Sequence, residues 1–218
     1  MSSFEKSLST KANLDFEFAV LESSGELLIA GVDEAGRGAI AGPVYAAAVI
    51  LALKNPESLS NLNQVDDSKK KTARQREELY HLIKSNALAY GVGSSPAATI
   101  DREGIISANA QAMMNAVAKL DPSAAYLLID GRMRLKNLSI PQESIIRGDS
   151  KSLSIAAASI LAKVTRDRYM KSLAHRYPGY GLERNMGYCT PEHVSSLKEL
   201  GPTSEHRHSF APIRLTLL

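Results

Sequence analysis

The stretch that decides the fold covers residues 27–53 and reads LLIAGVDEAGRGAIAGPVYAAAVILAL. Two apolar runs, 27–32 and 44–53, lie on either side of a glycine-rich connection, and they predict two β-strands paired as a hairpin. The first run ends at Asp33 and Glu34, so two carboxylates stand where a buried strand gives way to a loop. This stretch therefore predicts a sheet with acidic side chains at one of its edges.

Outside this stretch, helical and strand-like patterns alternate. Apolar residues recur at helical spacing in four segments, which are 72–88, 105–120, 153–175 and 191–200. Short apolar runs predict further strands at 89–93, 126–129 and 144–147. The composition of 55–64 is typical of a loop. The mixture predicts an α/β fold in which a mixed β-sheet is flanked by helices.

The chain length suits one domain with a small appendage. We expect an N-terminal lead-in over 1–25, a main domain over 26–176 and a small helical C-terminal part over 177–218. The 218 residues are 44% hydrophobic and 22% charged, which excludes a disordered or collagen-like chain. The single cysteine, Cys189, excludes an internal disulfide framework and a cysteine-rich zinc site.

Targeting patterns and common nucleotide motifs are missing from the sequence. No apolar run is long enough to span a membrane, and the N-terminus lacks the pattern of a signal peptide, so we expect a cytoplasmic protein without membrane contact. The sequence holds no Walker A loop, no G-x-G-x-x-G and no His-Glu-x-x-His. Residues 151–218 contain 10 Lys and Arg against 5 Asp and Glu. This is a modest indication of a polyanionic partner, although solvated helix faces explain it equally well.

Acidic residues follow three of the apolar runs: Asp33 with Glu34, then Asp130, then Asp149. If these strands are neighbours, four carboxylates converge and raise each other's pKa values. Such crowding is costly unless a cation neutralises it, and oxygen ligands favour Mg²⁺ or Mn²⁺. A single Asp at a strand end is more often a turn former or a helix cap, and spacing alone does not make the strands neighbours.

Other polar motifs allow two interpretations each. The loop Gly36-Arg37-Gly38 lets the backbone approach a ligand closely and adds a phosphate-binding guanidinium, but such a triplet is often only a turn. The charged run at 67–71 could contact phosphate or lead into a helix. Tyr188 lies among basic residues and could stack on a sugar or base, or pack in the core. The cluster His206-Arg207-His208 with His193 could bind a metal ion, but without a cysteine or a helical i, i+4 pair of histidines we favour a basic surface segment.

Several of these motifs occur together and in order, which makes them far more specific than any one alone. They are the segments 31–38, 42–44, 67–70, 129–131, 148–150, 156–167 and 187–188, followed by Thr190 and His193. In this order they resemble the type 2 ribonuclease H family, and within it the bacterial ribonuclease HII branch. The resemblance implies a ribonuclease H-like fold, with a mixed sheet, flanking helices and a small helical C-terminal part.

The resemblance also assigns roles to particular residues. The catalytic and metal-binding acids of the family fall on Asp33, Glu34, Asp130 and Asp149. The substrate-binding positions fall on Gly36, Arg37 and Gly38, which read the 2′-hydroxyl, on Tyr188, which stacks on the sugar at the RNA–DNA junction, and on Lys69. Asp167 belongs to the family's helix signature, and we expect it to be paired locally.

The implied activity is that of an endoribonuclease that hydrolyses the RNA strand of RNA–DNA hybrids and cuts 5′ to single ribonucleotides in duplex DNA. Two Mg²⁺ or Mn²⁺ ions would serve the reaction, which leaves 5′-phosphate and 3′-hydroxyl ends. The expected partners are the hybrid and ribonucleotide-containing DNA, and the expected state is a monomer. Two alternatives stay open: a metal nuclease that cuts all-DNA substrates, and a hybrid-binding module without catalysis.

Overall fold

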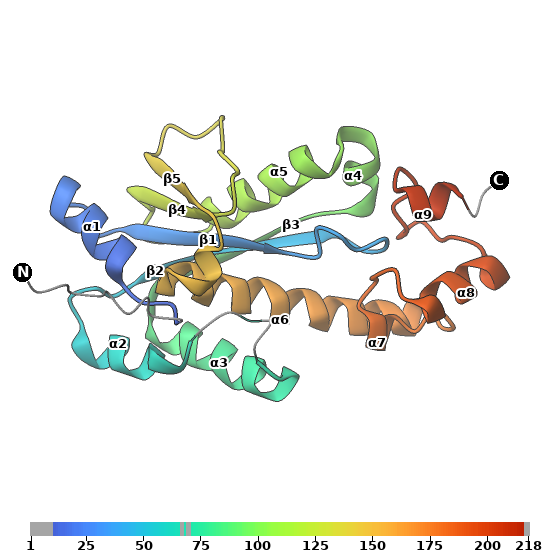
Figure 1. The fold of residues 1–218 in the computed structure, drawn as a ribbon, viewed down its shortest axis with the longest axis horizontal. Helices are drawn as coiled ribbons and strands as arrows, with labels where there is room; N and C mark the ends of the chain where they lie inside the picture. The colour runs from blue at the N-terminus through green and yellow to red at the C-terminus, as the bar shows by residue number, and fades with distance from the viewer. Residues whose placement is uncertain (1–10, 66–67, 69–70, 216–218) are drawn as a thin grey trace, which may run out of the picture.

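The structure is a computed structural model that describes residues 11–65, 68 and 71–215. Its centre is a five-stranded sheet in the order β3-β2-β1-β4-β5 (Figure 1). The strands are β1 (Ile29–Ala35), β2 (Val44–Leu51), β3 (Ala87–Ser95), β4 (Tyr126–Asp130) and β5 (Gln142–Ile145). β1, β2 and β3 pair antiparallel, whereas β4 runs parallel to β1 and β5 runs parallel to β4. The predicted mixed sheet is therefore confirmed, and β1, β4 and β5 end at the same edge.

Helices cover both faces of this sheet (Figure 1). α6 (Leu153–Arg176) and α3 (Ala73–Asn86) pack on one face, and α5 (Ile105–Val117), preceded by α4 (Ala97–Glu103), packs on the other. The other helices are α1 (Asp15–Ser24), α2 (Pro56–Asn61), α7 (Leu182–Asn185), α8 (Pro191–Leu200) and α9 (Ala211–Arg214), with 3₁₀ turns η1 (Leu62–Gln64) and η3 (Gly148–Ser150). The predicted flanking helices are confirmed.

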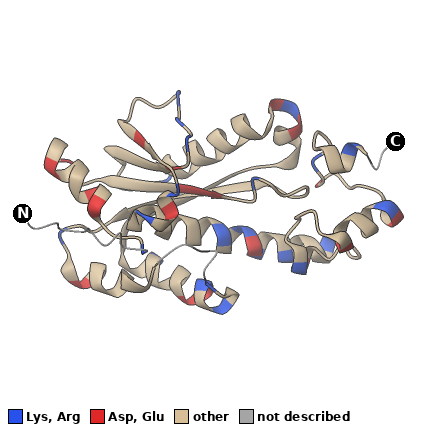
Figure 2. Cartoon of the chain, in the orientation of Figure 1, with Lys and Arg blue, Asp and Glu red and all other residues tan. Residues whose placement is uncertain are grey.

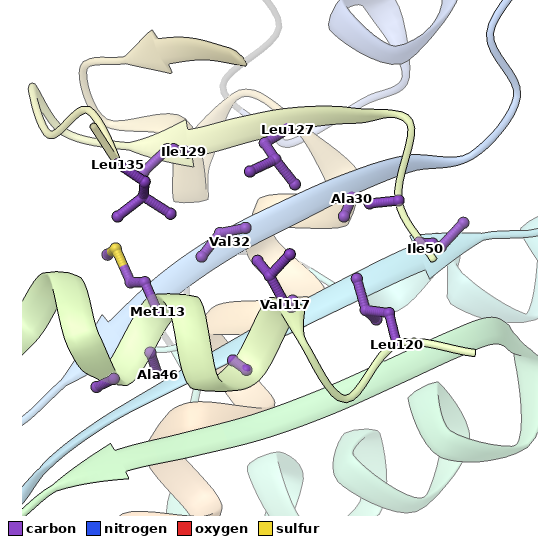
Figure 3. Packing of buried hydrophobic residues seen from close by; sticks show 14 of the residues in the cluster. Ala30, Val32, Ala46, Ile50, Met113, Val117, Leu120, Leu127, Ile129 and Leu135 are labelled. Carbon is purple, nitrogen blue, oxygen red and sulfur yellow. The ribbon is translucent and has the colours of Figure 1, made fainter. Parts of the chain in front are cut away.

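Alternating side chains of the central strands supply two hydrophobic cores. Figure 3 shows the core under α5, where Val32 of β1 and Leu127 of β4 lie close to Met113 and Val117 of the helix. Alternate side chains of β2, such as Val49, point to the opposite face of the sheet and pack against α6. Complete burial of a side chain of this kind stabilises the fold by about 1.5–3 kcal/mol. The central strands are therefore held on both faces, which fixes where their last residues lie.

β1 and the start of α6 are packed with no room for a side chain between them. A Cβ atom at Gly31 would lie 2.1 Å from the carbonyl carbon of Ser154, so only glycine permits this approach. Because η3 immediately precedes α6, the contact brings Asp149 towards the end of β1. The glycine in the first predicted strand thus has a packing function.

The first described helix, α1, is tied to the same place. The Glu17 carboxylate is buried and accepts hydrogen bonds from the Ser152 hydroxyl (2.6 Å), the Ser154 N–H (2.9 Å) and the Ser154 hydroxyl (2.6 Å). A negative charge at a helix N-terminus is favourable because the free N–H groups and the helix dipole point towards it. The described part of the lead-in expected over 1–25 therefore contains a helix, α1, and its Glu17 caps α6.

The C-terminal part extends from the far end of α6 (Figure 1). α7, α8 and α9 enclose a third apolar cluster, in which Tyr180, Leu197 and Ile213 pack against Met170 and Leu173 of α6. No helix among the described residues is long and apolar enough to cross a membrane. The domain boundaries expected from the sequence remain a prediction.

Two of the elements differ from the sequence-based expectation. β5 occupies Gln142–Ile145, two residues earlier than predicted, because its register is set by pairing with β4. The loop predicted over 55–64 is wrong, since Pro56–Asn61 form a helix. The Asn55 side chain caps this helix by accepting a hydrogen bond from the Ser58 N–H at 3.1 Å. By contrast, α8 begins and ends at the predicted residues.

Candidate active site

Acidic side chains gather where β1 and β4 end. The parallel register pairs Val32 with Ile129, so the next residues, Asp33 and Asp130, lie side by side at the sheet edge. Glu34 follows on β1. Asp149 does not end a strand, as the sequence had suggested, but lies in the 3₁₀ turn η3 between β5 and α6. The sheet thus brings the acids together, with Asp149 supplied by a turn.

The charges of these acids act on one another. Burial raises the pKa of Asp33 well above its ordinary value, and the negative charges of Glu34, Asp130 and Asp149 raise it further. Burial also raises the pKa of Glu34, against the opposing effects of the Asn109 amide and the Arg37 guanidinium. A buried group of carboxylates that disfavour each other's ionised forms is a site that a cation stabilises. The chemistry of this donor set therefore fits a hard divalent ion such as Mg²⁺ or Mn²⁺.

Backbone groups hold two of the carboxylates in place. The Glu34 N–H donates to Asp33 Oδ1 at 2.7 Å, and the Gly148 N–H donates to Asp130 Oδ1 at 2.6 Å. Within the described part of the chain, no three His, Cys, Asp or Glu side chains stand arranged to hold a single ion. The two hydrogen bonds orient one oxygen of each of these acids.

The loop Gly36-Arg37-Gly38 follows the acid pair and is held from the protein interior by a buried arginine. Arg207 is fully buried and donates to the carbonyl oxygens of Gly36 (2.7 Å), Arg37 (2.9 Å) and Gly42 (3.0 Å). The interpretation of the 206–208 segment as a basic surface is therefore wrong. The Arg37 side chain is itself half exposed, with its guanidinium 3.7 Å from the Glu34 carboxylate.

A second buried arginine, Arg166 of α6, supports the same connection. It donates to the carbonyl oxygens of Ala41 (3.2 Å), Pro43 (3.1 Å) and Met186 (2.9 Å). Gly36 has φ +84°, and a Cβ there would lie 1.8 Å from Arg166 Nε, so glycine is required on both counts. Sequence reasoning missed both arginines, since a lone charged residue gives no sign of burial.

Tyr188 lines the same cavity as the Gly36–Gly38 loop and is partly exposed. The Lys163 ammonium lies 5.9 Å, and the Arg166 guanidinium 5.4 Å, from the centre of its ring. These cations can hold the ring by cation–π attraction. The Gly187 carbonyl accepts hydrogen bonds from the N–H groups of Ile40 (2.8 Å) and Ala41 (3.2 Å), which ties the tyrosine segment to the β1–β2 connection.

The Tyr188 backbone is held by two buried histidines. The Thr203 N–H donates to His206 Nδ1 at 3.0 Å, so the neutral ring carries its proton on Nε2. That proton faces His193 Nε2 at 3.1 Å, which leaves the His193 proton on Nδ1 to be donated to the Tyr188 carbonyl at 2.9 Å. Burial lowers the pKa of both rings, that of His206 to about 4, so the pair is neutral near pH 7.

A cavity of about 460 Å³ lies beside the acids and the Gly36–Gly38 loop. Of the residues singled out in the sequence, Asp33, Glu34, Gly36, Arg37, Gly38, Asp130 and Tyr188 line it. Asp149 is buried and does not line it, although its charge affects Asp33. Lys69 lies outside the described residues. The structure thus brings together seven of the nine expected positions.

Four further residues of the wall were given no role in the sequence analysis, although three of them belong to the motifs at 67–70 and 156–167: Ser68, Arg76, Ser159 and Lys163. The Ser68 and Ser159 hydroxyls are 2.8 Å apart, and Arg76 donates to the Ser68 carbonyl at 3.1 Å. Lys163 donates to Asp167 at 2.8 Å, which confirms the expected local pairing of that acid. Ser159 and Lys163 lie on α6, Arg76 lies on α3 and Ser68 lies between η1 and α3, so only the fold brings these residues to one wall.

Known proteins are similar to this chain in sequence and in fold. The family model described as Ribonuclease HII matches residues 30–213. Ribonuclease HII of Geobacillus thermodenitrificans is 51% identical over 197 residues, which is 90% of this chain and 73% of that one. Ribonuclease HII of Bacillus mycoides is 50% identical over 194 residues, covering 89% of this chain and 73% of that one.

Solved structures agree with these sequence matches. The crystal structure of ribonuclease H2 from Pyrococcus horikoshii OT3 has a TM-score of 0.73 at 27% identity and covers 86% of this chain and 96% of that one. RNase HII in its complex with PCNA from Archaeoglobus fulgidus has a TM-score of 0.68 at 26% identity, with 84% and 95% covered. The chain therefore belongs to the ribonuclease HII family, and it is a nuclease of the ribonuclease H type that acts on RNA–DNA hybrids.

Proposed function

We propose that this enzyme cuts 5′ to a single ribonucleotide embedded in duplex DNA, as well as within longer hybrids, and that it leaves 5′-phosphate and 3′-hydroxyl ends. The observation that carries the proposal is the shared cavity. A carboxylate cluster at the ends of β1 and β4 opens into the same space as the Gly36–Gly38 loop and Tyr188. The groups suited to hydrolysis and the groups suited to reading a sugar thus line one cavity.

We assign metal binding and catalysis to Asp33, Glu34, Asp130 and Asp149. Two Mg²⁺ or Mn²⁺ ions bound there would activate the attacking water and stabilise the departing 3′ oxygen. The chain's own contribution is to gather the negative charge and to orient it. The N–H groups of Glu34 and Gly148 donate to one oxygen each of Asp33 and Asp130 and so orient these two carboxylates.

We assign recognition of the ribose to the loop and to Tyr188. Within the described chain, the N–H groups of Arg37 and Gly38 have no protein acceptor. They are suited to a hydrogen bond with a 2′-hydroxyl oxygen, the group that distinguishes RNA from DNA. The Tyr188 ring would stack on the sugar at the junction. For Lys69 we retain the proposal of a phosphate contact.

Cleavage of a DNA duplex that carries one ribonucleotide tests the proposal. It is run with Mg²⁺, with Mn²⁺ and with EDTA, beside an all-DNA duplex and a continuous hybrid. We expect a metal-dependent cut 5′ to the ribonucleotide and an intact all-DNA duplex. Cleavage of the hybrid alone would contradict the single-ribonucleotide activity, and cleavage of all-DNA would contradict the role of the loop.

Two variants separate the assigned roles. Asp130→Asn removes a metal ligand and no phosphate contact, so cleavage should be abolished while the affinity for the duplex stays close to wild type. Near-normal turnover would remove Asp130 from the catalytic set. Tyr188→Ala should weaken cleavage at a single ribonucleotide more than cleavage of a long hybrid, and equal effects on both would contradict the junction role.

The proposal also includes a cytoplasmic location and a monomeric state. Cys189 is a free, exposed cysteine, which fits a reducing compartment. Cell fractionation and light scattering of the purified protein test these two points. Recovery outside the cytoplasm, or a mass of twice 23.5 kDa, would contradict them.

A further inference from the structure

Positive charge is concentrated in the segment that connects β4 to β5. Residues 131–141 read GRMRLKNLSIP and contain Arg132, Arg134 and Lys136 but no Asp or Glu. All three cations are exposed. We call these three residues the basic arm. The segment begins directly after Asp130, so the first cation of the arm is two residues from an acid of the active site.

The residues between the cations anchor the arm to the protein. Leu135 is buried in the core under α5, and Met133 packs against the same cluster. The Gln142 side chain accepts from the Leu135 N–H at 2.7 Å and donates to the Leu135 carbonyl at 3.0 Å. The Ser144 hydroxyl donates to the Met133 carbonyl at 2.5 Å. Alternate residues are thus held inward, and the cations between them must point outward.

Several other basic positions on the surface have acidic partners. Arg74 pairs with Glu78, Arg168 with Glu77, and Arg184 with Glu192. In the described part of the chain, no carboxylate forms an ion pair with any cation of the arm. Figure 2 shows blue positions and no red ones along the loop between β4 and β5. Three neighbouring, uncompensated charges attract a polyanion and repel one another when none is bound.

The sheet order places the arm on a particular side of the active site. The Gly36–Gly38 loop joins β1 to β2, whereas the arm joins β4 to β5, so the two lie on opposite sides of the β1 acids. Tyr188 lies on the side of the Gly36–Gly38 loop, because Gly187 bonds to Ile40 and Ala41. A duplex that crosses the acids from the tyrosine side continues over the arm.

We propose that the basic arm binds the phosphodiester backbone of the substrate duplex, on the side of the cleavage site away from Tyr188. The proposal rests on the hybrid as the substrate and assigns the arm affinity rather than chemistry. Alternate residues of an extended segment are about 6.6 Å apart, a spacing that allows consecutive cations to meet neighbouring phosphates. Such contacts carry no sequence preference and make binding depend on salt.

Binding of a fluorescent RNA–DNA hybrid in EDTA, where no cleavage occurs, tests the arm. The test variant is Arg132→Gln with Arg134→Gln, and the matched control is Lys54→Gln with Lys119→Gln. The control cations are also exposed, and they follow β2 and α5 at the other end of the sheet. Both pairs remove two positive charges. We expect the arm variant to bind roughly tenfold more weakly at 0.1 M salt, with the slope of log K against log salt shallower by about 2, and the control to match wild type.

Hybrids shortened stepwise from each end locate the contact. The arm variant and the wild type should converge in affinity when one end is shortened, and stay different when the other end is. Equal binding of the arm variant and the control to the full hybrid would overturn the proposal, and so would a loss that is the same whichever end is removed. If the wild type itself fails to cleave the hybrid with Mg²⁺ or Mn²⁺, the failure lies with the proposed function and not with the arm.

Discussion

Replacing Glu17 with glutamine measures how strongly α1 holds the start of α6. Glutamine keeps an oxygen that can accept the three hydrogen bonds from Ser152 and Ser154, but it removes the negative charge that strengthens them. Each bond weakens from about 1.5–3 to about 0.5–1.5 kcal/mol, and the lost interaction with the helix N-terminus adds up to about 2 kcal/mol. The lower desolvation cost of the neutral side chain offsets part of this sum. We expect a net loss of about 2–3 kcal/mol in the free energy of unfolding.

Thermal and denaturant unfolding provide the measurement. For a chain of this size the expected loss lowers Tm by about 4–12 °C. Glu22→Gln is the matched control, because it makes the same change at an exposed position of the same helix. If the Glu17→Gln variant has the same Tm and free energy of unfolding as the Glu22→Gln variant, the carboxylate does not cap α6.

Three further outcomes are expected. Asp33→Asn should abolish cleavage yet raise the free energy of unfolding at pH 8. The folded protein raises the pKa of Asp33, so ionisation of the wild-type side chain costs stability above that pKa. In urea unfolding, the advantage of the Asn variant should therefore vanish as the pH falls to about 4. The fold lowers the pKa of His206 to about 4, so the neutral side chain contributes its full stability above about pH 6.5 and loses it as the pH falls towards 4. Across that window the free energy of unfolding of the wild type should fall by on the order of 3 kcal/mol more than that of His206→Asn. Parallel curves of unfolding free energy against pH for the two proteins would contradict this. Arg207→Lys keeps the charge but loses the forked guanidinium that binds two carbonyls of the loop. It should raise KM for a duplex with a single ribonucleotide, while hybrid binding in EDTA changes little. An unchanged KM would show that Arg207 does not position the loop for the substrate.

Local signals in the sequence were sufficient where they act over a few residues. α8 was predicted at its observed bounds because Thr190 caps it, Pro191 begins it and Gly201 ends it. The helix after Asn55 had comparable signals, an Asn before a Pro, which the polar composition of the segment obscured. β5 was misplaced because its short sequence is largely polar, and pairing with β4 fixes its position.

Residues with long-range partners could not be identified from the sequence. Glu17 binds serines 135 and 137 positions away, and Arg207 binds carbonyls as far as 171 positions away. Polarity alone predicts exposure for such residues, and the fold reverses that expectation by supplying partners. The sequence could propose the acids because each follows an apolar run, which is a local pattern, whereas their clustering depends on the fold. Asp149 was proposed from the same pattern, although a 3₁₀ turn and not a strand end presents it.

The hydrogen bonds of Arg207 also fix which way the Gly36–Gly38 loop faces. A trans peptide unit is planar, and its N–H points away from its carbonyl oxygen. The Gly36 carbonyl shares its plane with the Arg37 N–H, and the Arg37 carbonyl shares its plane with the Gly38 N–H. Because Arg207 draws both oxygens inward, it turns two adjacent amide hydrogens outward. A buried cation thereby sets the orientation of the loop, and two adjacent backbone N–H donors are turned away from the protein interior.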